Sequence, residues 1–257
     1  MKIGTSTLFL LLLITFGACK KDEQDSQPVT PAVASGNCSF KLNHNWAGAA
    51  TPFQLETEYT NSVTGDALSF TTFKYYISNI KLKKSDGSWY IHPNSYFLVD
   101  LSNSQTATVS LSNIPVGDYT DVQYTFGVDS TRNVSGVQDG ALSPSNGMFW
   151  SWNTGYIMSK AEGISANSSS GSFAFHLGGF QGVNSVVTEK LINLSSLNTL
   201  TIAAGSSTEI GISVDIMKMF ESSPSLSVTN DLQMPGAAAK TMAVSFVSGM
   251  TLGYVTD

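Results

Sequence analysis

Residues 140–156 read Gly-Ala-Leu-Ser-Pro-Ser-Asn-Gly-Met-Phe-Trp-Ser-Trp-Asn-Thr-Gly-Tyr, and no other stretch of the chain constrains the fold as strongly. Trp150 and Trp152 stand two residues apart, so an extended backbone places both indoles on one face of a β-sheet. Gly, Pro and Asn residues on both sides favour turns. Two indoles on one face need a matching hollow opposite, and their N–H groups need partners if they are buried. The stretch therefore predicts an aromatic corner of a β-sandwich.

The same two-residue period continues upstream and downstream of this corner. Residues 40–46 place Phe40, Leu42, His44 and Trp46 on one face of a strand, which we expect to be the inner face. Further strands are predicted over 54–60, 68–82, 89–101, 106–111, 119–128, 148–159, 171–177, 186–191, 200–203 and 208–214. No segment sustains a 3.6-residue period, and only 212–220 and 242–250 are compatible with a helix. We therefore predict an all-β, antiparallel β-sandwich in a single domain, with the tail from Ser222 wrapped around it.

The N-terminus predicts export and a lipid anchor. Residues 1–18 read as a secretory signal peptide, with Lys2 at its start and an apolar run over 8–16 that is too short to span a bilayer. Gly17-Ala18-Cys19 is the bacterial lipoprotein pattern, which makes Cys19 the lipid attachment site. Residues 19–37 then form a polar linker, and the folded domain covers 38–257. We expect an outer-membrane lipoprotein that faces the periplasm or, given the acidic residues after Cys19, the cell surface.

Charge and cysteine content exclude several classes of protein. The net charge is −6 and charged residues make up 12% of the chain, so the composition gives no electrostatic basis for binding nucleic acid. If Cys19 is acylated, Cys38 is the only remaining thiol and no intrachain disulfide can form. The fold must then depend on its hydrophobic core, for which the chain is long enough. We interpret Cys38 as a buried small apolar residue.

The chain has three histidines, at positions 44, 92 and 176. His92 precedes a proline beside Trp89 and Tyr90, which favours a partly exposed structural role. His44 belongs to the inward face of the first strand, and His176 is followed by glycines that leave its imidazole unscreened. By itself, each of these two residues is either a hydrogen-bonded core histidine or a metal ligand.

The chain resembles the MbnP-like proteins, which are named after a periplasmic partner from a methanobactin copper-acquisition cassette. The resemblance extends in order from about Phe40 to about Gly179. The motifs that carry it are Phe40…His44, Tyr75-Tyr76-Ile77-Ser78-Asn79-Ile80-x-Leu82, Tyr96-x-Leu98-x-Asp100, Pro115-x-Gly117-x-Tyr119, Gly127-Val128-Asp129-Ser130, the stretch 140–157, Lys160-x-Glu162-Gly163 and Phe175-His176-Leu177-Gly178-Gly179.

This resemblance implies copper binding. Proteins of this kind bind Cu(I) through histidine nitrogens together with a kynurenine made by oxidation of a tryptophan. Carried over by position, His44 and His176 become candidate ligands, and Trp150 or Trp152 becomes the candidate for oxidation, with Trp46 as the competing choice. The resemblance also implies two partners, a di-haem peroxidase-like maturation enzyme and a copper importer. Imidazole suits Cu(I), which accepts low coordination numbers.

One feature of the family is missing from this chain. The resemblance leads us to expect a further histidine in the C-terminal region, where residues 231–236 read Asp-Leu-Gln-Met-Pro-Gly. Met234 offers a thioether there as a substitute ligand. Met148 and Met158 also carry thioethers, but packing is the simpler explanation for both.

Hydrolytic and redox chemistry find no support in the sequence. It has no Gly-x-Ser-x-Gly, no Gly-rich phosphate loop, no Cys-x-x-Cys and no His-Glu-x-x-His. Asp129, Asn133 and Asp139 could hold calcium, although turn capping is the simpler explanation. We therefore predict a copper-binding lipoprotein that is not an enzyme. The alternative is a surface lipoprotein that holds no metal and binds a glycan or protein partner through exposed aromatic residues.

Overall fold

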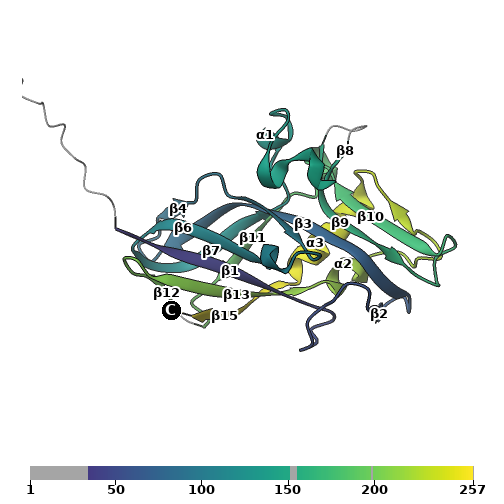
Figure 1. Ribbon diagram of the computed structural model, residues 1–257, viewed down its shortest axis with the longest axis horizontal. Coiled ribbons are helices and arrows are strands. Elements are labelled where there is room, and N and C mark those ends of the chain that lie inside the picture. Colours follow the sequence, from purple (N-terminus) through teal and green to yellow (C-terminus); the bar gives the residue numbers. More distant parts are fainter. Residues whose placement is uncertain (1–33, 151–154, 198, 257) are drawn as a thin grey trace, which may run out of the picture. The chain divides into compact units, whose positions relative to one another are not determined.

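The computed structural model describes residues 34–150, 155–197 and 199–256, and Val33–Asp257 form one compact unit. The predicted signal peptide over 1–18, the lipid attachment site Cys19 and most of the predicted linker over 19–37 lie outside the described residues, as does Trp152. Within the described ranges, strands make up most of the regular structure (Figure 1). The prediction of an all-β single domain is confirmed.

The smaller of two sheets has four strands in the order β15–β13–β1–β6. Its strands are β1 (Ser35–Asn45), β6 (Thr108–Pro115), β13 (Ser207–Asp215) and β15 (Met250–Thr256). β1 directs Cys38, Phe40 and Leu42 into the core, each at most 2% exposed, as the alternating pattern predicts. β1 begins inside the predicted linker, and it pairs with β13 in parallel, although most pairings in the fold are antiparallel.

The larger sheet has 11 strands, with the main path β11–β7–β3–β9–β10–β14. The strands of this path are β3 (Ala67–Lys84), β7 (Gly117–Phe126), β9 (Gly155–Ile164), β10 (Ser172–Gly178), β11 (Thr188–Asn193) and β14 (Asp231–Leu232). Five short strands extend it: β2 (Glu58–Thr60), β4 (Trp89–Ile91), β5 (Tyr96–Asp100), β8 (Phe149–Trp150) and β12 (Leu200–Ile202). β3 is the longest strand, with 18 residues, and lies between β7 and β9 (Figure 1).

Two predicted strands have different boundaries from those that the sequence pattern indicates. The predicted strand over 89–101 divides into β4 and β5, because Asn94 between them has a φ of 49°, in the left-handed region that ends a strand. The predicted strand over 106–111 begins with a turn of 3₁₀ helix, η1 (Ser104–Ala107), before β6. These boundaries depend on single turn residues, which a two-residue hydrophobic period does not detect.

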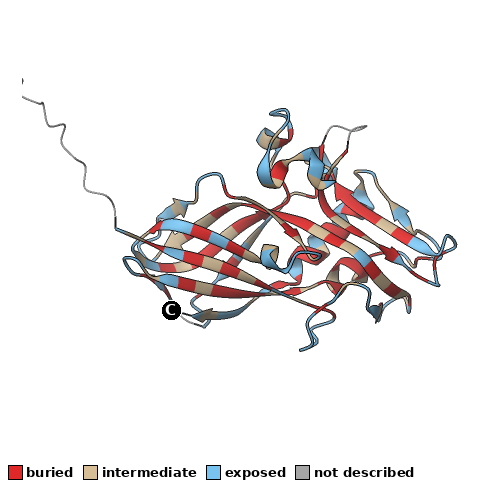
Figure 2. Cartoon of the chain, in the orientation of Figure 1, coloured by how far each residue is buried: buried red, intermediate tan, exposed pale blue. Residues whose placement is uncertain are grey.

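The C-terminal tail completes the core. The described ranges contain three α-helices, which are α1 (Ser130–Asn133), α2 (Met217–Glu221) and α3 (Ala237–Ser248), and the tail holds the longest of them, α3. One face of α3 is buried, and Ala237, Ala238 and Val244 on the exposed face weaken the contrast in polarity between the two faces. Phe246 of α3 packs on Phe73 and Tyr75 of β3, with ring centroids 5.6 and 5.3 Å apart. The tail thus covers the inner face of the larger sheet and ends as β15, an edge strand of the smaller one. Figure 2 shows the resulting alternation of buried and exposed residues along the strands.

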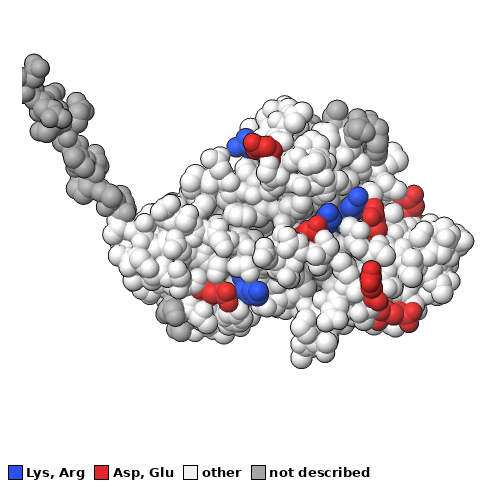
Figure 3. Space-filling view, in the orientation of Figure 1, with Lys and Arg blue, Asp and Glu red and all other residues white. Residues whose placement is uncertain are grey.

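Charged side chains on the face in Figure 3 are sparse, and most occur singly or beside a side chain of opposite sign, while one small group at the lower right is acidic only. None of the helices in the described ranges is both long and apolar enough to span a membrane.

Candidate metal centre

His176 lies on the outer face of the larger sheet, in β10. Lys160 of β9 is its cross-strand partner and is itself paired with Lys74 of β3, so the three side chains leave the same face. The neighbouring Phe175 points to the opposite face and packs on Phe220 of the core, with ring centroids 5.7 Å apart. His176 is nevertheless only 7% exposed. Its imidazole is therefore enclosed by other side chains on the outer face.

The two ring nitrogens of His176 have different surroundings. Nε2 lies 2.7 Å from Oε1 of Glu162, whereas Nδ1 is buried without a hydrogen-bond partner in the described part of the chain. Burial lowers the pKa of His176, and this effect exceeds the opposing effect of Glu162. Burial alone raises the pKa of Glu162, but the hydrogen bond from His176 and the charge of Lys160 bring it below its ordinary value. At neutral pH, Nε2–H therefore donates to a charged carboxylate and Nδ1 keeps a free lone pair.

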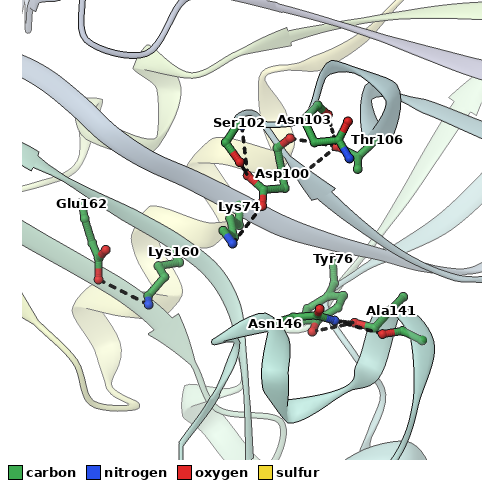
Figure 4. Close-up of polar contacts among 11 residues, drawn as sticks. Lys74, Tyr76, Asp100, Ser102, Asn103, Thr106, Ala141, Asn146, Lys160 and Glu162 are labelled. Atoms are coloured by element: carbon green, nitrogen blue, oxygen red, sulfur yellow. Dashed lines mark hydrogen bonds and ion pairs between the residues drawn. The ribbon is translucent and has the colours of Figure 1, made fainter.

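The carboxylate that orients His176 is itself held in place (Figure 4). Nζ of Lys160 lies 3.4 Å from Oε1 of Glu162. In the same row of side chains, Nζ of Lys74 lies 2.8 Å from Oδ2 of Asp100. The pair with Lys160 restricts Glu162 and, through it, the ring of His176.

A glycine brings Trp150 to the same region. Trp150 is in β8 and pairs with Gly155 of β9. The six-membered ring of its indole lies over Gly178, where an added Cβ would come within 2.2 Å of Cζ3. Gly178 follows His176 by two residues and shares its face of β10. The structure therefore brings Trp150 and His176 to neighbouring positions, and a side chain at position 178 would prevent it.

The segment before β8 is docked on the sheet by buried tyrosines. It contains two 3₁₀ helices, η2 (Gly140–Leu142) and η3 (Pro144–Asn146). The hydroxyl of Tyr76 donates to the carbonyl of Ala141 at 3.0 Å, and Asn146 donates to the same carbonyl at 2.9 Å (Figure 4). The hydroxyl of Tyr156 donates to the carbonyl of Leu142 at 2.7 Å. These bonds fix the approach of the chain to Trp150, as expected for the predicted aromatic corner.

The segment after β14 runs alongside β10. Leu232 of β14 pairs in parallel with Phe175, and a Cβ added at Gly179 would lie 3.0 Å from Cβ of Pro235. Met234 follows β14 directly before this proline and is 63% exposed. The region in which the family resemblance predicts another histidine is therefore adjacent to the strand of His176, and it offers a methionine.

His44 lies on the other side of the larger sheet. Its Nε2 is 2.8 Å from the hydroxyl of Tyr75. Tyr75 follows Lys74 in β3, so it points away from the face that carries Lys74, Lys160 and His176. β9 also separates β3 from β10. In this arrangement one ion cannot contact both imidazoles.

The other candidate side chains have structural partners. Trp46 donates from Nε1 to the carbonyl of Thr60 at 3.0 Å within the aromatic core. The sulfur of Met158 accepts the backbone N–H of Val128 at 3.2 Å, and Met148 is fully buried. Both nitrogens of His92 lie within 3.2 Å of backbone carbonyls near the surface.

Two of the three predicted calcium candidates, Asp129 and Asn133, act in turn capping, whereas the side chain of Asp139 does not cap the 3₁₀ helix that follows it. Oδ1 of Asp129 accepts the backbone N–H of Arg132 at 3.1 Å, at the start of α1, and Oδ2 accepts from Asn79 at 2.9 Å. Asn133 donates to the carbonyl of Asp129 at 3.0 Å. Across residues 34–150, 155–197 and 199–256, no group of three or more His, Cys, Asp or Glu side chains is arranged to hold a metal ion. A site at His176 therefore needs donors of other types.

The sequence alone does not single out Glu162 or Tyr75 as functional residues. Glu162 lies in Lys160-x-Glu162-Gly163, and its two-residue spacing from Lys160 places both on one face of a predicted strand. That spacing is the only local signal for Glu162. Tyr75 gives none, because its partner His44 comes from a distant strand.

His44 predicts a measurable dependence of stability on pH. Burial lowers its pKa to about 4, from about 6.5 in an unfolded chain. Between these values the unfolded chain binds a proton that the folded chain does not. The neutral His44 therefore contributes to the free energy of unfolding in full above about pH 6.5, and this stability is lost as the pH falls through about 4. Between pH 7 and about 4.5, we expect the free energy of unfolding in urea to fall by about 1–3 kcal/mol more in the wild type than in His44→Gln. Equal losses in the two proteins would contradict this assignment.

Comparisons with known proteins agree with the fold. The sequence profile of the MbnP family matches residues 35–242. The structure of MbnP from Methylosinus trichosporium is similar, with a TM-score of 0.50 and 14% sequence identity, over 80% of this chain and 84% of that one. No curated protein matches the chain at a significant level. At this identity the structural similarity establishes the fold alone.

Proposed function

Because this chain belongs to the MbnP family, we propose that it binds Cu(I) for sequestration or transfer and catalyses no reaction. The observation that supports this most strongly is the buried Nδ1 of His176, which has no hydrogen-bond partner in the described residues. Glu162 holds the opposite nitrogen at 2.7 Å. A histidine that binds a metal commonly donates its other N–H to a carboxylate, which fixes the ring and makes the ligating nitrogen more basic.

The donors around His176 suit Cu(I) better than a hard cation. An imidazole and a thioether are ligands that Cu(I) favours, and Cu(I) accepts low coordination numbers. We propose His176 as the first ligand and Met234 as the second. Trp150, which lies over Gly178, or Trp152 supplies a third after oxidation to kynurenine, because an intact indole is a poor ligand. His44 is separated from this group by the sheet and is not part of the proposed site.

The proposal includes the cellular setting implied by the N-terminal sequence and the family. Residues 1–18 direct export, Cys19 carries the lipid, and the domain is held at the outer membrane by the linker. A di-haem peroxidase-like enzyme oxidises the tryptophan, and a copper importer receives the ion. A glycan- or protein-binding role is less well supported, because most aromatic side chains of the described residues are buried in the core.

Cu(I) titration and intact mass together test the proposal. Protein purified from the native host is titrated with Cu(I) in competition with a chromogenic chelator under anaerobic conditions. We expect one bound ion per chain and the small mass gain that distinguishes kynurenine from tryptophan. A His92→Ala variant, in which a half-buried histidine outside the site is removed, is expected to bind as the wild type does. Absence of binding by native-host protein would refute the proposal.

Glu162 tests the orientation of His176 separately. Glu162→Gln retains an oxygen that can accept from Nε2–H but removes the charge, so we expect Cu(I) affinity to fall by about 10- to 100-fold, as for other residues that hold a metal ligand. The matched control is Glu189→Gln, because Glu189 is an exposed acid in a different strand, β11. Equal affinities for wild type and Glu162→Gln would show that the carboxylate does not support the ligand.

A further inference from the structure

A cavity of about 470 Å³ lies beside the C-terminal half of β1. It exists because the pairing of β6 with β1 ends at Lys41 and Thr108. Beyond that pair, η1 and a loop that includes Phe53 border the open edge of β1. Leu42, Phe53 and Leu101 contribute apolar walls, and His44 also lines the cavity.

The hydroxyl of Tyr75 determines which nitrogen of His44 carries the proton. Tyr75 is fully buried, and in the described residues its hydroxyl has one partner, Nε2 of His44 at 2.8 Å. If Nε2 carried the proton, the hydroxyl hydrogen of Tyr75 would be buried without an acceptor, at a cost that folded proteins avoid. Tyr75 therefore donates to Nε2, and the proton of the neutral imidazole is on Nδ1.

Nδ1–H of His44 is available to a ligand in the cavity. It makes no hydrogen bond with the described residues and, unlike Nδ1 of His176, it is not shut off from solvent. As a protonated nitrogen it donates a hydrogen bond and does not bind a metal. The cavity therefore offers a hydrogen-bond donor at the end of an apolar wall.

The charges near the cavity favour an anion. Lys41, which also lines it, donates to the neutral hydroxyl of Thr108 at 3.3 Å and has no carboxylate partner among the described residues. The acid in the wall, Asp100, is neutralised by Lys74 at 2.8 Å and fixed by Ser102 (Figure 4). One cation thus remains without a counter-charge, in a protein whose net charge is negative.

We propose that this cavity binds a small organic carboxylate. The carboxylate accepts the hydrogen bond from Nδ1–H of His44, while the hydrocarbon part of the ligand contacts Leu42, Phe53 and Leu101. Lys41, which lines the cavity from the opposite face of β1, attracts the carboxylate at longer range. A pocket with apolar walls and few placed polar groups is typical of small-molecule sites. The site is separate from the proposed metal centre and does not depend on it.

Hexanoate is a suitable probe, with hexylammonium as a control of similar shape and opposite charge. The measurement is an NMR titration of protein with labelled histidines. We expect hexanoate to cause a saturable shift of the His44 ring resonances and no shift at His92. Hexylammonium should leave His44 unchanged. Lack of saturation, or equal effects of the two compounds, would refute the proposal.

Two lysine variants separate the proposed contact from a general effect of charge. Lys41→Gln removes the unpaired cation at the cavity, and we expect the dissociation constant for hexanoate to rise about three- to fivefold. Lys83→Gln removes a cation that lies beside Trp89, away from the cavity, and should leave the dissociation constant unchanged. Equal effects of the two substitutions would overturn the role of Lys41. Because Lys41 is not part of the core, its variant is expected to fold.

Discussion

The Phe70→Ala variant is expected to lose about 3–5 kcal/mol of unfolding free energy. Phe70 is fully buried in β3. It contacts aromatic rings from several parts of the chain, including Phe53, Phe173 and Phe220, each with ring centroids 5.3 Å away. Its removal leaves a cavity that neighbours held by three different segments cannot collapse to fill. β3, β10, α2 and the loop that contains Phe53 therefore lose a shared contact.

Urea unfolding at neutral pH measures this loss. Leu191→Ala is the matched control, because Leu191 is 57% exposed on β11. Its substitution should change stability by no more than about 0.5 kcal/mol. A loss below about 1 kcal/mol for Phe70→Ala would show that the aromatic core rearranges around the gap.

His176→Ala is expected to weaken Cu(I) binding by at least about 100-fold, more than loss of an orienting residue does. The reason is that Nδ1 of His176 is the only buried imidazole nitrogen in the described residues that lacks a hydrogen-bond partner. By contrast, the proton on Nδ1 of His44 and the bond from Tyr75 to its Nε2 leave that ring no free lone pair. His44→Ala should therefore keep Cu(I) affinity close to that of the wild type.

The comparison of the two histidine variants decides between two arrangements of the site. If one ion were held jointly by His44 and His176, both substitutions would abolish binding. If the site is at His176, only His176→Ala does so. Circular dichroism of both variants provides the control for folding. Retained affinity in His176→Ala would reject the proposed centre, whatever the behaviour of His44→Ala.

Met234 is the residue that we propose takes the place of another histidine in the site. β14 pairs in parallel with β10, so the segment that follows it runs alongside the strand of His176. A thioether can bind Cu(I) and is a poor ligand for hard cations. The sequence identified Met234 as a substitute ligand, and the pairing of β14 with β10 brings its segment to the strand of His176.

Local patterns predicted much of the secondary structure and little of its pairing. The alternating residues of β1 were sufficient to predict that strand and its inward face, because burial of every second residue is a property of the strand itself. β3 was also predicted as a strand, but its buried positions change phase after Phe70, where the pairing with β9 shifts register, and residues 75–78 are all buried. The parallel pairing of β1 with β13 joins residues that are about 170 positions apart, and no local pattern records it. The sequence allowed a helix over 242–250, whereas α3 spans 237–248, and the apolar Ala and Val residues on its exposed face hid its helical period.

The sequence by itself determined the alternating strands, the MbnP family and the residue types able to bind copper. The tertiary structure alone decided which of them meet: Trp150 comes beside His176 over Gly178, Glu162 orients the imidazole, and His44 lies across the sheet with Tyr75. The physical reason is the register of β3, β9 and β10. A shift of one residue would move each side chain to the opposite face, and that register is set by contacts between distant segments.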